Sequence, residues 1–117
     1  MKIQIKRVYD EPCEDDGTRV LVDRLWPRGL AKADAKLDLW AKDITPSTEL
    51  RKWFGHDSDK FKRLTERYRC ELAENRAAVD EFLDQIDRRK RLTLLYAAKD
   101  PKVNHAVVLK AFLEEIG

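Results

Sequence analysis

The stretch RLTLLYAA, from Arg91 to Ala98, decides the fold. From Leu92 onward its residues are almost continuously apolar, without the alternation of a strand that has one face in water. Such a run is typical of a central parallel strand, because parallel strands are usually covered on both faces. The sequence therefore predicts a buried strand at this position.

Helical patterns lie on both sides of this strand. One helix is expected after the capping residues Asp57 to Asp59, another after Asn75, and a last one that opens at Asp100 and Pro101. A shorter helix is expected to start around Thr45 to Glu49 and to end near Gly55. The apolar residues at helical spacing are Phe61, Leu64, Tyr68, Leu72, Val79, Phe82, Leu83, Ile86, Leu109, Phe112, Leu113 and Ile116.

Three earlier segments have extended patterns. Lys2 to Tyr9 alternates, with Ile3 and Ile5 on one face, which predicts a half-exposed strand. Arg19 to Leu25 contains three consecutive apolar residues and predicts a covered strand, and Leu37 to Ala41 predicts a short one. The link between the first two strands has no helical crossover, so they are either antiparallel or separated in the sheet.

These elements predict an α/β fold, a three-layer sandwich with a small, mostly parallel sheet flanked by helices. No linker and no internal repeat divides the chain, so residues 1–117 are expected to form a single domain.

Composition narrows the function classes only in part. The chain has 24 Lys and Arg against 22 Asp and Glu, a net charge of +2, which neither requires nor excludes nucleic acid. Cys13 and Cys70 have no CxxC spacing, which favours a reduced, cytoplasmic protein. The segment from Met1 to Tyr9 has no unbroken apolar run, so neither a signal peptide nor a membrane association is expected.

Polar residues follow the predicted strands, where ligands of open parallel sheets bind. The densest segment is Asp23 to Gly29, in which arginine forks suit a carboxylate or phosphate and Trp26 offers a stacking face. In the alternative interpretation, Arg24 pairs with Asp23 or Asp43 to stabilise a bend, and Trp26 fills the core.

His105 stands where the last helix begins, near the strand ends, and suits a general acid or base. The alternative is a histidine that caps or hydrogen-bonds a loop. The predicted catalytic residues are His105 and Asp23. The predicted ligand-binding residues are Arg7, Arg24, Trp26, Arg28, Ser47, Lys99 and Asn104.

Neither a metal site nor a cofactor is predicted. The two histidines and two cysteines are scattered, without ligand spacing. Cys13 lies in an acidic loop, which disfavours a reactive thiolate. The four glycines form no phosphate loop, so a phosphate would be held by side chains or by a helix N-terminus such as the turn from Thr45 to Ser47.

Three runs together resemble the YeaO-like family of small bacterial domains of unknown function: RVLVDRLWPRG (19–29), DITPSTELRKWFGHD (43–57) and LLYAAKDPKVNHAVVLKAFL (94–113). The resemblance covers nearly the whole chain. It implies a cytoplasmic α/β domain and supplies no mechanism. The family's distinctive polar positions correspond to residues 23, 24, 26 to 29, 46, 47, 53, 99, 100, 104 and 105.

Three functions stay open. The first is an enzyme or a binding domain for an anionic small molecule of nucleotide or phosphate type, at the carboxyl ends of the strands. The second is a nucleic-acid-binding accessory or regulatory domain, and the third is a protein-interaction module with Trp40, Trp53 or Phe54 exposed. The cations of the second hypothesis are Lys60, Lys62, Arg63, Arg67, Arg69 and Arg88 to Arg91. The oligomeric state is left open.

Overall fold

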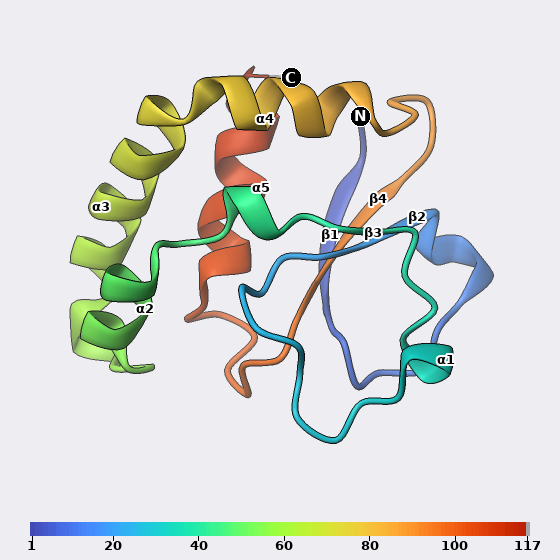
Figure 1. Ribbon diagram of the computed structural model, residues 1–117, viewed down its shortest axis with the longest axis horizontal. Coiled ribbons are helices and arrows are strands. Elements are labelled where there is room, and N and C mark those ends of the chain that lie inside the picture. The colour runs from blue at the N-terminus through green and yellow to red at the C-terminus, as the bar shows by residue number, and fades with distance from the viewer. Residues whose placement is uncertain (117) are drawn as a thin grey trace.

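The computed structural model describes residues 1–116 and places the predicted central strand in the middle of a parallel sheet (Figure 1). This strand, β4 (Leu92–Tyr96), pairs with β1 (Ile3–Arg7) on one side and with β2 (Thr18–Leu21) on the other. A short strand, β3 (Leu39–Trp40), continues the sheet beyond β2. The strand order is β1-β4-β2-β3 and each pair is parallel, which confirms the α/β class and the parallel sheet.

The first two strands of the chain, β1 and β2, are not neighbours in the sheet. Both β1 and β2 run parallel to β4 and are separated by it, since Ile5 and Val20 both lie opposite Leu94. β2 is shorter than the predicted segment, because the chain turns away from the sheet after Val22, whose backbone nitrogen still donates to Leu95 O at 3.0 Å. The residues after this point are therefore free to line a site.

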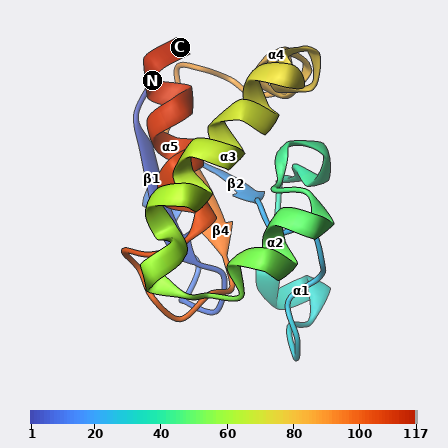
Figure 2. The ribbon, with the colours of Figure 1, turned by 90° about the vertical axis from the view of Figure 1, so that its left-hand side faces the viewer.

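The long helices cover one face of the sheet, as Figure 2 shows from the helical side. They are α2 (Thr48–Phe54), α3 (Phe61–Glu74), α4 (Arg76–Asp84) and α5 (His105–Ile116). The side chains that form this core include Val20, Val22, Leu64, Tyr68, Leu72, Val79, Phe82, Leu92, Leu94, Tyr96, Leu109 and Leu113. Among the helices described, none is long and apolar enough to cross a membrane.

The other face carries a thinner cover. Val8, Leu21 and Leu95 point to this side, where the loop after β2 and the one-turn helix α1 (Lys32–Ala35) lie over them. The covering side chains are Trp26, Leu30, Leu37 and Trp40. The third layer is therefore mostly loop.

Helix α5 begins later than the sequence suggested. Asp100 does not open it; its Oδ1 accepts hydrogen bonds from the backbone nitrogens of Lys102 (2.8 Å) and Val103 (3.2 Å) and so closes a single turn. Asn104 then caps the helix, because its Oδ1 accepts from Val107 N at 3.2 Å. By contrast, the predicted ends of α2 are confirmed, with Ser47 as the N-cap and Gly55 as a left-handed C-cap.

A buried polar cluster at the start of β2 was not predicted. The Asp16 carboxylate pairs with Arg19 and with Lys6, whose Nζ lies 3.1 Å away, and it also accepts from Cys13 N at 3.0 Å. Burial raises the pKa of the Asp16 carboxyl, but the hydrogen bonds from Cys13, Lys6 and Arg19 outweigh it and hold the pKa below its usual value. The polar face of β1 is thus partly occupied by this cluster.

Candidate functional site

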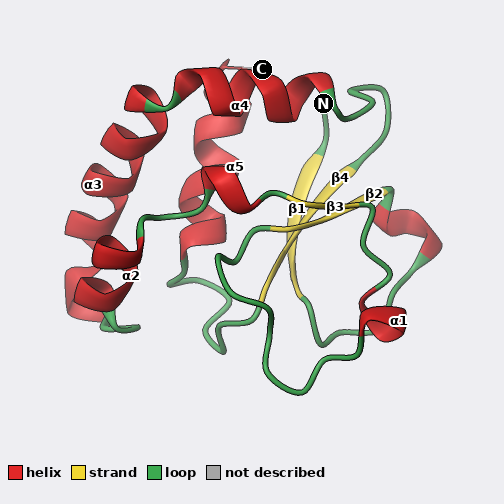
Figure 3. Cartoon of the chain, viewed as in Figure 1, coloured by secondary structure: helices red, strands yellow, loops and turns green. Residues whose placement is uncertain are grey.

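A cleft of about 960 Å³ opens at the carboxyl ends of β2 and β4. Figure 3 shows the loops that follow both strands at the same end of the sheet. Most of the lining comes from residues 23–28, 97–100 and 103–105. The rest comes from the end of α2 and the two residues after it (Arg51, Lys52, Phe54, Gly55 and His56) and from Tyr9, Pro46 and Leu64. The cleft is therefore where the topology of an open parallel sheet places a ligand.

Asp23 and His105 meet at the base of this cleft. Asp23 Oδ2 accepts a hydrogen bond from Ala97 N at 3.0 Å, which ties the end of β2 to the end of β4. His105 Nε2 lies 2.9 Å from Asp23 Oδ1 and 2.8 Å from the Val22 carbonyl oxygen. The two predicted catalytic residues are thus brought together; the proton transfer assigned to them stays a prediction.

The cleft is rich in cations without partners. Its lining includes five Lys and Arg side chains and two carboxylates, an excess larger than the net charge of +2 of the whole chain. The five cations are Arg24, Arg28, Arg51, Lys52 and Lys99. Within residues 1–116 none of the five forms an ion pair, and the one hydrogen bond among their side chains joins Arg24 Nε to Pro46 O at 3.0 Å.

The two carboxylates of the cleft form no ion pairs with these cations within residues 1–116. Asp23 is committed to Ala97 N and His105, and Asp100 to the turn before α5. Arg24 pairs with neither Asp23 nor Asp43, so the ion pair of the alternative interpretation does not form. The positive potential of the cleft is therefore available to a ligand.

Trp26 is shared between the cleft and the thinner layer of the fold. Its ring lies edge-on to Trp40, with centroids 5.4 Å apart at 70°, and its Nε1 donates to Leu30 O at 2.8 Å. Both contacts hold the indole in place. The ring lines the cleft and packs against the core at the same time, and the stacking of a ligand on it stays a prediction.

Two predicted ligand-binding residues lie outside the cleft lining. Arg7 braces the end of β4, because its Nε and Nη2 donate to the carbonyls of Ala98 (3.0 Å) and Ala97 (3.2 Å). Ser47 caps α2: its Oγ accepts from Leu50 N at 3.1 Å and donates to Glu71 Oε2 at 2.5 Å. Both side chains have protein partners in the structure, and the ligand binding assigned to them stays a prediction.

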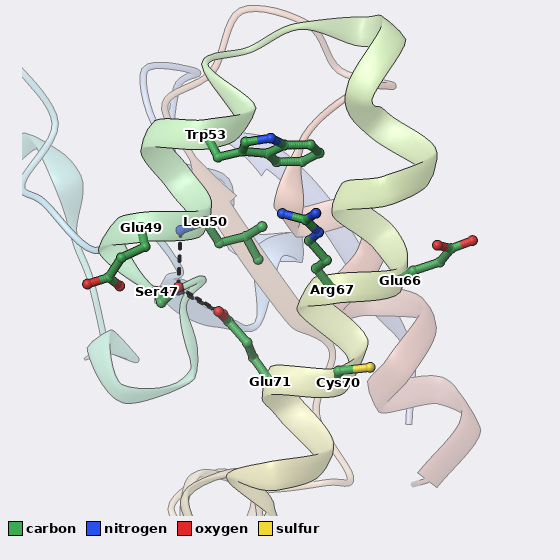
Figure 4. Close-up of a pocket in the computed structure, with 8 residues that line it drawn as sticks. All are labelled: Ser47, Glu49, Leu50, Trp53, Glu66, Arg67, Cys70 and Glu71. Atoms are coloured by element: carbon green, nitrogen blue, oxygen red, sulfur yellow. Dashed lines mark hydrogen bonds between the residues drawn. The ribbon is translucent and has the colours of Figure 1, made fainter.

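Ser47 lies in a second, shallower groove of about 610 Å³ between α2 and α3 (Figure 4). There the guanidinium of Arg67 lies over the ring of Trp53, 4.4 Å from its centroid. Glu71 reaches across to Ser47 and joins the two helices. The visible contacts of this groove are those of helix packing.

A buried tyrosine lies close to the cleft. The Tyr68 hydroxyl donates to Ile44 O at 2.6 Å. Burial, together with the negative charges of Glu71 and Asp23, raises the pKa of Tyr68 well above its ordinary value. Tyr68 therefore stays a neutral donor.

The sequence did not reveal the wall that α2 contributes. Arg51, Lys52, Phe54 and His56 line the cleft, yet a basic pair near a helix end is also what the helix dipole favours. Only the packing of α2 against α3 turns this end toward the strand ends. In the part of the chain described, no group of three or more His, Cys, Asp or Glu could hold a metal ion.

Comparisons with known proteins give relatives along the whole chain. The family model described as "DUF488-N3i: Inactive DUF488-N3 subclade" matches residues 2–116. The "Uncharacterized protein YeaO" of Escherichia coli (strain K12) is 48% identical over 116 residues, which are 99% of this chain and 100% of that protein.

Two mycobacterial proteins are more distant. The "Uncharacterized protein Mb3100c" of Mycobacterium bovis and the "Uncharacterized protein Rv3073c" of Mycobacterium tuberculosis are each 38% identical over 112 residues, 96% of this chain and 93% of theirs. No solved structure matches the chain.

Proposed function

This chain belongs to the DUF488-N3i family, the inactive DUF488-N3 subclade, and from that premise we propose that it binds an anionic small molecule of phosphate type in the cleft without converting it. The membership and the relative from Escherichia coli confirm the resemblance to the YeaO-like family. The observation that carries the proposal is a group of five cations around one concave site that form no ion pair within residues 1–116. Arginine forks and lysine ammonium groups are the usual partners of phosphate in proteins.

Two further observations favour binding over turnover. The family description itself uses the word inactive. Among the described residues that line the cleft there is no cysteine, serine or threonine to act as a nucleophile, and the one hydroxyl, that of Tyr9, donates to Arg28 O at 2.8 Å. Asp23 and His105 then serve to shape the base of the site.

Removing charge from the α2 wall is the direct test. The double variant Arg51→Gln, Lys52→Gln is expected to weaken the binding of propyl phosphate about tenfold, because it removes two of the charge-assisted donors. Both residues are exposed, and neither forms an ion pair with another described residue, so the variant should fold normally. Isothermal titration calorimetry at low salt measures the dissociation constants.

The matched control is Lys62→Gln, Arg63→Gln. These exposed neighbours on α3 lie outside the cleft lining, and the change removes the same charge. The control is expected to bind propyl phosphate as the parent does. Equal weakening in the two variants would show that net charge alone governs binding, and no binding by the parent would reject the proposed function.

The other two hypotheses have less support. Figure 1 places α3 and the segment after α4 on different sides of the molecule, so the two basic clusters do not form one strip for a nucleic acid. Phe54 is buried, while Trp40 and Trp53 are half-buried and each lies beneath a lysine or arginine, Lys42 at 4.5 Å and Arg67 at 4.4 Å. These three rings therefore do not make an exposed apolar patch.

A further inference from the structure

The surroundings of His105 determine which of its nitrogens carries a proton. Nε2 faces two oxygens, the Val22 carbonyl at 2.8 Å and Asp23 Oδ1 at 2.9 Å. Both oxygens only accept, so Nε2 must be the protonated nitrogen. Asp23 is held in place, because its other oxygen accepts from Ala97 N. Oδ1 is buried and forms no hydrogen bond within residues 1–116, so its 2.9 Å contact with Nε2 is an ion-pair contact and the hydrogen bond of Nε2 goes to the Val22 carbonyl.

The second nitrogen is consequently a bare acceptor. In a neutral imidazole only one nitrogen is protonated, so Nδ1 keeps its lone pair. Within residues 1–116 Nδ1 forms no hydrogen bond, and it is not one of the fully buried polar atoms that lack a partner, so it keeps some contact with solvent. His105 lines the cleft, so this acceptor belongs to a side chain that borders the site of the proposed function.

This acceptor differs from its neighbours. The five cations of the cleft are donors only. Asn104 uses its amide oxygen to cap α5 and its amide nitrogen to donate to Asp100 O at 2.8 Å. Asp100 uses Oδ1 for the turn before that helix, and its Oδ2, which forms no hydrogen bond within residues 1–116, is a carboxylate oxygen that disfavours a nearby anion. A ligand that satisfied the cations alone would leave Nδ1 in water or unpaired, whereas a ligand with its own donor would satisfy both.

We propose, on the basis of the proposed function, that the cleft selects phosphomonoesters whose organic part carries a hydroxyl group. The cations hold the phosphate, and the hydroxyl donates to His105 Nδ1. Asp23 is a positioning residue in this scheme, since it acts on the ligand through the tautomer of His105. Sites built to receive a ligand hydroxyl discriminate against analogues that lack it, because the site's polar group is then left without a partner.

The test compares two phosphate esters of equal charge and similar size. Glycerol 3-phosphate carries hydroxyl groups and propyl phosphate carries none. Calorimetric titration of the parent protein is done at a mildly alkaline pH, because a lower proton concentration favours a ring with one proton. Glycerol 3-phosphate is expected to bind about fivefold to tenfold more tightly, the net contribution of one hydrogen bond.

The outcomes separate this inference from the proposed function. Equal affinities for the two esters would overturn the hydroxyl selectivity and leave phosphate binding intact. Failure of both esters to bind would overturn the proposed function and this inference with it.

A variant locates the acceptor. His105→Gln keeps a side-chain N–H that can reach the position of Nε2 but has no acceptor at the position of Nδ1, so the preference for glycerol 3-phosphate is expected to disappear. His56→Gln makes the same replacement at the other histidine of the cleft lining and is expected to retain the preference. A preference that persists in His105→Gln would place the acceptor elsewhere and reject the role of His105.

A spectroscopic measurement covers the case in which His105→Gln does not fold. Nitrogen-15 spectra of the imidazole rings in the parent protein distinguish a protonated from a bare ring nitrogen. The expected result for His105 is a protonated Nε2 and a bare Nδ1, and in Asp23→Asn this tautomer should be less uniform. Protonation of Nδ1 in the neutral ring would overturn the inference.

Discussion

Replacing Gly17 with alanine is expected to destabilise the protein by about 2–6 kcal/mol, the combined cost of a strained backbone and of overpacking. Gly17 has φ 64° and ψ −129°, a conformation that residues with a Cβ rarely adopt. A Cβ at this position would also overlap the backbone of Arg91, where the chain enters the central strand β4. Thr18 N donates to Arg91 O at 2.8 Å, so the overlap would disturb the pairing of β2 with β4.

Gly29→Ala is the matched control. Gly29 also has a positive φ, 74°, but no atom lies within 4 Å of the place where a Cβ would stand. Gly29→Ala should lower the free energy of unfolding only by the cost of a left-handed backbone at a residue with a Cβ, about 1–2 kcal/mol. Urea denaturation of both variants measures the free energies of unfolding. Equal losses would show that the contact with Arg91 does not contribute.

Asp16→Asn is expected to cost about 3–5 kcal/mol, the usual effect of removing one partner from a buried ion pair. Asp16 is 2% exposed and Arg19 is 5% exposed, so neither charge can turn to water. The substitution keeps the shape of the side chain but leaves the buried guanidinium without its counter-charge. It also removes the charge that Lys6 approaches to 3.1 Å. Chemical denaturation at neutral pH measures the loss.

Asp80→Asn provides the comparison for a surface pair. Asp80 lies 3.0 Å from Arg76 on α4, and both side chains are at least half exposed. Removing the charge of Asp80 should lower the free energy of unfolding by no more than about 0.5 kcal/mol. A similar loss for Asp16→Asn and Asp80→Asn would contradict the importance that we assign to the buried cluster.

The same carboxyl gives the stability a defined pH dependence. The pKa of Asp16 is lower in the folded protein than the ordinary value, so its ionised form stabilises the fold above about pH 4, where an unfolded aspartate is ionised. That contribution is lost as the pH falls through the lower, folded pKa. The stability difference between the parent and Asp16→Asn should therefore be constant from neutral pH to about pH 5 and shrink at lower pH. Unfolding curves over this range measure the effect, and a difference that does not shrink would contradict it.

These two substitutions probe stability apart from binding. Asp16 and Gly17 precede β2, and Arg91 precedes β4, whereas the cleft lies at the opposite, carboxyl ends of these strands. Variants of the cluster that remain folded should keep their affinity for a phosphate ester. The cleft variants should in turn change affinity with little effect on unfolding.

Much of the secondary structure follows from local patterns in the sequence. The apolar run of β4 predicts a central strand because it leaves no face for water, and the structure pairs it on both sides. Ser47 and Gly55 mark the ends of α2 because their side chain and backbone conformation satisfy a helix terminus. The sequence predicts the start of α5 too early. Asp100 and Asn104 can both cap a helix, and the sequence alone does not show which of them does so.

The candidate site was predictable where it depends on chain topology. Residues after parallel strands gather at one edge, which is why Asp23, Arg24, Lys99 and His105 share a cleft. Arg7 and Ser47 also follow predicted strands in the sequence. In the structure, however, Arg7 donates to backbone carbonyls and Ser47 donates to Glu71. Whether a polar side chain meets a ligand or a protein group depends on neighbours that lie far away in the chain.

The sequence by itself determined the α/β class, the central strand and the polar segments at the strand ends, because hydrophobic periodicity and turn residues act over a few neighbouring positions. Only the tertiary structure decided that β4 separates β1 from β2, that α2 brings Arg51 and Lys52 to the cleft, and that Asp23 meets His105. These contacts join segments that are distant in sequence, and they arise from the packing of helices on the sheet and from strand register. No local pattern encodes such contacts, since each depends on the shape of both partners at once.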